Sequence, residues 1–207
     1  LYRGQRGIPA GNPGADARHR MKEKRARKPR RITPDYLERA ALFYLQRYSS
    51  SSGNLKSVLQ RKVWRAARET EIDQEEANGW IDDVVAKIVR AGLLDDRRYA
   101  ETRVLSLRRS GESARSIRMK LAAKGVEGDL VERALQQDEP ENDELTAAIA
   151  YARKRRLGPF HKAGKREERQ DKDLAALARR GFSYETCRLV IEARDERALE
   201  VLLAERF

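Results

Sequence analysis

Apolar residues recur at intervals of three and four positions through most of the chain from residue 33 onward. After Thr33, for example, Leu37, Ala41 and Tyr44 fall on one face of a helix. Thr33 can cap that helix, and Pro34 suits its first position. No segment shows the sustained alternation of apolar and polar residues that indicates a strand. The pattern therefore predicts an all-α protein.

The predicted helices form three successive groups, which we interpret as three tandem three-helix repeat units. We expect these units at residues 33–93, 94–138 and 139–207, the last with an inserted basic loop near 160–170. Residues 1–32 are rich in glycine, proline and basic residues, and they predict a disordered N-terminal arm. Each unit is too small to bury much apolar surface alone, so neighbouring units are expected to stack.

An internal repeat supports this division of the chain. Residues 120–135 align with residues 176–191, so that Gly125 matches Gly181. Each glycine follows a basic residue and precedes an apolar one, which is the pattern of a helix that ends in the left-handed conformation. The first unit departs from this pattern, because no glycine follows Lys62.

The excess of basic over acidic residues indicates what kind of partner the protein binds. The 207 residues include 45 Lys and Arg but only 33 Asp and Glu, which gives a net charge of +12. Such an excess favours a polyanionic partner, with nucleic acid first, but it carries no information about base sequence. The basic arm either binds nucleic acid or only keeps the protein soluble. The sequence begins at Leu1, so Met21 is a candidate for the true start.

The residue types needed for catalysis or for metal binding do not cluster in the sequence. Cys187 aligns with Val131 in the repeat and is expected to be a buried apolar residue, and His19 and His161 are far apart. The segment 158–166 departs from a phosphate-binding loop in its glycine spacing, and it lacks the Ser or Thr that binds magnesium. We predict no enzyme activity, no cofactor and no metal. No apolar run is long enough to cross a bilayer, and the expected location is the cytoplasm.

Several aromatic side chains could stack on nucleic-acid bases. Their helical spacing beside Leu and Ala favours a place in the core instead, and we expect this for Tyr36, Tyr44, Tyr48, Trp64, Trp80 and Tyr99.

The segment AGLLDDRRYAETRVLSLRRSGESARSIRMKLAAKGVEGDLVERAL resembles the signature of the RecX family. The matching positions are Gly92, Leu93, Leu94, Asp95, Asp96, Tyr99, Ala100, Gly111, Arg115, Ile117, Leu121, Lys124, Gly125 and Val126. The rest of the chain from Pro34 is similar to the family more loosely. The missing glycine after Lys62 puts the helix junction of the first unit in doubt.

The resemblance implies a fold, a partner and an activity. RecX-like proteins are elongated, curved arrays of three-helix units that act on the RecA recombinase. The resemblance thus implies a monomeric protein that binds RecA filaments on single-stranded DNA. It would suppress strand exchange and ATP hydrolysis, and so regulate DNA repair, recombination and the SOS response. The alternative is a stand-alone helical repeat protein that binds nucleic acid without sequence preference.

The second unit combines the signature with the densest basic charge. Its candidates for contact with RecA or DNA are Arg103, Arg108, Arg109, Arg115, Arg118 and Lys124, and the third unit offers Arg179 and Arg180. A basic face that serves only solvation is the competing interpretation. Capping, packing and turn geometry account for the other signature positions, which are Gly92, Asp95, Asp96, Tyr99, Ala100, Gly111, Ile117, Leu121 and Gly125.

Overall fold

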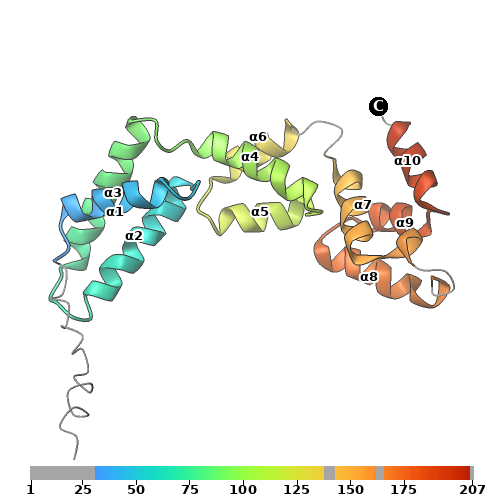
Figure 1. The fold of residues 1–207 in the computed structure, drawn as a ribbon, viewed down its shortest axis with the longest axis horizontal. Helices are drawn as coiled ribbons and strands as arrows, with labels where there is room; N and C mark the ends of the chain where they lie inside the picture. The colour runs from blue at the N-terminus through green and yellow to red at the C-terminus, as the bar shows by residue number, and fades with distance from the viewer. Residues whose placement is uncertain (1–30, 138–142, 162–165, 206–207) are drawn as a thin grey trace, which may run out of the picture. The chain divides into compact units, whose positions relative to one another are not determined.

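The computed structural model describes residues 31–137, 143–161 and 166–205. All the regular secondary structure in these three ranges is helical, as the sequence predicted (Figure 1). The expected arm lies outside the described residues up to residue 30, and so does Met21. Ile32, which the sequence pattern assigned to the arm, is buried against the first helices instead.

The first unit consists of α1 (Pro34–Leu45), α2 (Ser52–Ala66) and α3 (Gln74–Arg90). Each helix has a side-chain cap at its start: Thr33 accepts a hydrogen bond from Tyr36, Ser51 from Asn54, and Asp73 from Glu75. These caps satisfy amides that have no partner within the helix.

The end of α2 shows why the first unit needs no glycine after Lys62. The helix continues to Ala66 without a left-handed residue. Both the amide and the hydroxyl of Thr70 donate to the carbonyl of Ala66, each at 3.0 Å. A threonine side chain thus does here what a left-handed turn does at the other junctions.

The second unit consists of α4 (Asp96–Arg109), α5 (Ala114–Ala122) and α6 (Gly128–Gln136). The third begins with α7 (Glu144–Arg155) and continues through short 3-10 helices at Gly158–Phe160 (η2) and Glu167–Arg169 (η3). It then contains α8 (Gln170–Arg180), α9 (Tyr184–Glu192) and α10 (Glu196–Ala204). The expected loop near 160–170 is therefore partly helical, and the described part of the third unit has four α-helices instead of three.

Each unit has its own buried core. The cores centre on Leu37, Leu55, Leu59 and Ile81 in the first unit, on Val104, Ile117 and Leu121 in the second, and on Leu145, Leu177, Ile191 and Leu199 in the third. Cys187 lies in the third core, so its expected burial is confirmed. The boundaries at residues 93 and 138 stay a prediction.

Five helices end in the same way, with a left-handed residue followed by an amide that reaches back five residues. At four of these ends the left-handed residue is glycine: Gly92, Gly111, Gly125 and Gly181. The fifth is Arg156, at the end of α7, with φ of 56°. The amide of Leu157 donates to the carbonyl of Ala152 there at 2.9 Å, so the hydrogen bonding is the same without the glycine.

Successive units are joined by a repeated hydrogen bond. The serine that caps the second helix of one unit donates to the carbonyl of the basic residue before the glycine of the next unit. Ser51 donates in this way to Lys124, and Ser113 donates to Arg180 at 2.7 Å. The same two serines also accept from the first turn of their own helices.

A carboxylate completes each of these junctions. The amide of Ser52 donates to Asp96 at 2.7 Å, and the amide of Ala114 donates to Glu144 at 3.1 Å. Asp96 and Glu144 are the first residues of α4 and α7, which open the second and third units. A carboxylate at the start of each unit thus satisfies an amide at the start of the second helix of the preceding unit, where the dipole favours negative charge.

The backbone at the first junction leaves no room for a side chain. A Cβ atom built on Gly53 would lie 2.7 Å from the Cα of Gly125, and one on Gly125 would lie 2.8 Å from the Cα of Gly53. Gly125 must therefore be glycine for two reasons, its φ of 67° and this close approach. Gly92 has a similar φ of 70° but no neighbour within 4 Å.

We predict that Gly125→Ala destabilises the protein more than Gly92→Ala. Both variants place a side chain in the left-handed region, which costs about 1–2 kcal/mol. Only Gly125→Ala also forces two backbone segments apart, which adds about 1–3 kcal/mol. Urea unfolding of the two variants measures the difference, and equal losses of unfolding free energy would show that the junction does not hold in solution.

Candidate nucleic-acid interface

Three of the exposed contact candidates in the second unit have side chains that are not engaged by other described residues. Arg103 and Arg109 lie on α4, and Arg115 lies near the start of α5. Among the described residues, none of these guanidinium groups has an ion-pair partner. They are free to bind an external anion.

Arg108 is not an exposed contact, and this expectation is corrected. Its side chain is buried, with 6% of the residue exposed. It pairs with Glu144 and donates to the carbonyl of Glu112 at 3.5 Å. The guanidinium thus neutralises the carboxylate that joins the second unit to the third, because a buried charge needs such a partner.

Arg118 and Lys124 are exposed but already engaged. Arg118 donates two hydrogen bonds to Glu132 on α6, at 2.6 and 2.8 Å, and this interaction lowers the pKa of the Glu132 carboxyl. Lys124 donates to the side chain of Asn54 at 3.3 Å. Reversing the charge of Arg118 would set two carboxylates against each other, so this residue is a poor choice for testing a contact surface.

Glu112 gathers cations from two units. Its side chain is 5% exposed and faces Arg180, Lys120 and the hydroxyl of Ser116. Burial alone would raise the pKa of this carboxyl, but hydrogen bonds from Lys120 and Ser116 and the charge of Arg180 outweigh burial and lower it. The Arg180 guanidinium also lies over the ring of Tyr151, 5.2 Å from its centre.

The basic candidates of the second unit and those of the third unit meet where these two units pack together. A Cβ atom built on Gly181 would lie 3.2 Å from the Cβ of Arg115 and 2.8 Å from the hydroxyl of Ser113. Arg115 of the second unit therefore lies against the residue that follows Arg180 of the third. Arg179 is exposed beside them on the last turn of α8. The sequence had treated these sets as alternatives, and the fold makes them neighbours.

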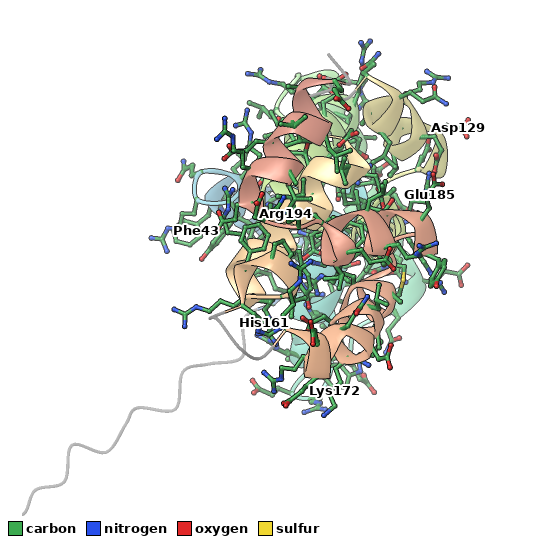
Figure 2. The ribbon with its side chains drawn as sticks, turned by 90° about the vertical axis from the view of Figure 1, so that its right-hand side faces the viewer. Phe43, Asp129, His161, Lys172, Glu185 and Arg194 are labelled. Atoms are coloured by element: carbon green, nitrogen blue, oxygen red, sulfur yellow. The ribbon has the colours of Figure 1, made fainter. Side chains whose placement is uncertain are left out.

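Two exposed aromatic residues, Tyr48 and Trp64, correct the prediction that these side chains lie in the core, and Tyr48 is 56% exposed. Trp64 is 54% exposed, and the Arg68 guanidinium lies over its ring at 3.9 Å. Phe43, for which the sequence made no such prediction, is also 56% exposed and lies beneath Arg47 (labelled in Figure 2). The signal was present in the sequence, because the buried stripe of α2 runs through Leu55, Leu59 and Val63 at intervals of four, and Trp64 falls beside it.

Comparison with known proteins decides the family. A family model described as RecX, second three-helix domain, matches residues 95–135. A curated relative from Myxococcus xanthus, named regulatory protein RecX, is 44% identical over 84% of this chain and 94% of its own length. The chain belongs to the RecX family. A regulatory protein RecX from Agrobacterium fabrum is 35% identical over 79% of the chain and 85% of its own length.

Solved structures of RecX proteins share the fold. The crystal structure of RecX from Lactobacillus salivarius covers 77% of this chain and 94% of its own, with a TM-score of 0.54 and 20% identity. A crystal structure of regulatory protein RecX matches with a TM-score of 0.55 and 22% identity over 77% of this chain and 71% of its own.

The RecX signature residues have structural roles. Asp95 caps α4 by accepting from the amide of Arg98 at 2.9 Å. Asp96 is not a cap but the carboxylate that joins α4 to Ser52. Tyr99, Ala100, Ile117 and Leu121 are buried in the core of the second unit, while Gly92, Gly111 and Gly125 end helices.

The described residues contain neither a helix that could span a membrane nor a cluster that could hold a metal ion. No helix within them is long and apolar enough to span a membrane. Nor do these ranges contain three or more His, Cys, Asp or Glu side chains grouped to hold a metal ion. His161 (Figure 2) lies instead in a buried pair with Asp173, which also accepts from the amide of Gly158 at 2.8 Å.

We predict that Glu112 makes the stability of the protein depend on acidic pH. Its folded pKa lies below the ordinary value of about 4.3, so its stabilising contribution is complete above that value and is lost as pH falls through the folded pKa. Glu112→Gln should therefore flatten the fall in unfolding free energy between about pH 5 and pH 3.

Glu192→Gln is the control for that experiment. Glu192 also has a lowered pKa, from its hydrogen bonds to Arg188, but the pair is exposed on one helix. Its removal should change the pH dependence much less. Equal effects of the two variants in urea unfolding would contradict a special role for the junction.

Proposed function

We propose that this protein binds RecA and RecA filaments on single-stranded DNA and inhibits recombinase and ATPase activity. The observation that carries the proposal is the 44% identity to a regulatory protein RecX along nearly the whole of that relative. It would act as a cytoplasmic monomer that needs no cofactor and catalyses no reaction, and it would thereby regulate DNA repair, recombination and the SOS response.

The exposed cations support this proposal. Arg103, Arg109 and Arg115 have the planar guanidinium that binds carboxylate and phosphate with two hydrogen bonds, so they suit both a protein filament and its DNA. The binding to DNA should be non-specific and salt-dependent, because interactions with phosphate carry no base identity.

A stand-alone nucleic-acid-binding protein is the second candidate. The exposed pair of Trp64 and Arg68 favours it, because an aromatic face flanked by a cation is a platform for stacking bases. The two functions differ in whether RecA is needed. Single-strand-stimulated ATP hydrolysis by the cognate RecA, measured with this protein below stoichiometry, separates them. Suppression supports the first function, and no effect at matched DNA occupancy supports the second.

We predict that replacing Arg103, Arg109 and Arg115 together by Gln raises the concentration needed for half-inhibition of RecA by about tenfold. Three solvent-exposed ionic interactions at about 0.5 kcal/mol each give this factor. The matched control replaces Lys172, Arg194 and Arg197, which are exposed on the third unit, by Gln with the same change in charge. An equal reduction of inhibition in both variants would mean that only net charge matters.

A further inference from the structure

A basic hollow lies between the last turns of α7 and α8. It has a volume of about 480 Å³. Its lining consists of Tyr151, Lys154, Arg155, Arg156, Leu157, Ala176, Arg179 and Arg180. Five of these eight residues are basic and none is acidic, so the hollow concentrates positive charge in one place.

Most of these cations are not used within the protein. Arg180 pairs with Glu112, and the neighbouring Arg153, which is not in the lining, reaches Glu196 at 3.7 Å. No described residue forms an ion pair with Lys154, Arg155, Arg156 or Arg179. Basic residues do stabilise the last turn of a helix through its dipole, which accounts for Lys154, Arg155, Arg179 and Arg180. It does not account for Arg156, which follows the last residue of α7.

Arg156 is the residue that the fold does not explain. It is the only non-glycine with a positive φ among the described residues, and the four other helix ends of this type have glycine. A left-handed arginine is strained, and strain of this kind is typically retained at sites that bind ligands. The conformation places a cation in the hollow where glycine would have satisfied the backbone equally well.

We propose that this hollow binds the phosphate backbone of single-stranded DNA, with Arg155, Arg156 and Arg179 as the principal residues that hold it. A guanidinium binds a phosphate through two parallel hydrogen bonds, and a strand presents one phosphate for each nucleotide. An acidic protein segment would also need apolar anchors, and of the lining only Leu157 and Ala176 are aliphatic. The inference rests on the proposed function, for which it names the site that holds the strand.

Arg156→Gly gives the sharpest test, because it should improve stability while it weakens binding. Glycine relieves the strain, so the melting temperature should rise by about 2–4 °C. The affinity for a fluorescein-labelled oligo(dT) strand, measured by anisotropy without RecA, should fall about threefold, because one exposed guanidinium no longer binds a phosphate. A merely structural arginine would give the first change without the second, which would overturn the proposal.

The double variant Arg155→Gln with Arg179→Gln tests the same site without changing the backbone. Its affinity for oligo(dT) should fall about tenfold, and the slope of log affinity against log salt should become shallower by about 1.4, for two phosphates released. Lys172→Gln is the control on α8, because Lys172 is exposed at the opposite end of that helix (Figure 2). It should change neither quantity by as much, and an equal change would refute a local site.

Two further measurements separate the possible failures. A poly-glutamate peptide that competes with oligo(dT) better than a strand of equal charge would overturn the proposal in favour of an acidic protein partner. If the variants bind strands normally while the unmodified protein suppresses RecA ATPase activity, only the site is refuted. If the variants no longer bind strands but the unmodified protein leaves RecA unaffected, the site stands and the proposed function fails.

Discussion

The fold depends on a hydrogen bond between a serine hydroxyl and the last turn of a helix in the next unit. Ser51 and Ser113 each serve two helices at once, accepting from an amide of their own helix and donating to the carbonyl of Lys124 or Arg180. A helix start and a helix end, which both have unpaired backbone groups, thus satisfy each other. At both places the left-handed glycine that follows the basic residue ends the helix.

Around these junctions the buried charged side chains are paired within the protein, and the unpaired cations are exposed. The carboxylates Asp96 and Glu144 accept from amides at helix starts, and the buried guanidinium of Arg108 neutralises the second of them. A buried arginine without Glu144 would be costly, so this pair fixes how α7 meets α4 and α5 more than it adds stability. The cations left over from such pairing are the ones available to a partner. This is why Arg108 and Arg118 differ in role from Arg103 and Arg109, although all four look alike in the sequence.

The sequence predicted the helices well, because their caps and apolar stripes are local. Thr33 and Asp95 cap the helices expected of them, and Gly125 and Gly181 have the positive φ that the repeat implied. The sequence did not predict contacts between residues that are far apart in the chain. Nothing in the sequence says that Arg108 faces Glu144, or that Arg115 lies against Gly181. The apolar stripe of Leu199, Leu202 and Leu203 does predict the helix α10, but the repeat interpretation counted only three helices in the third unit.

The third unit departs from the repeat at the start of its second helix, which is the position where the first and second units each contact the following unit. Its second helix, α8, begins after Arg169 without a side-chain cap, whereas α2 and α5 begin with the junction serines. Its first helix ends at Arg156, whereas the first helix of the second unit ends at Gly111, and α10 packs onto its core. A position freed from the junction geometry can accept residues that serve binding at some expense of stability. At Gly111, the matching position in the second unit, a Cβ atom would lie 2.7 Å from the backbone nitrogen of Tyr151 on α7, so a side chain there would disturb the packing of the third unit on the second.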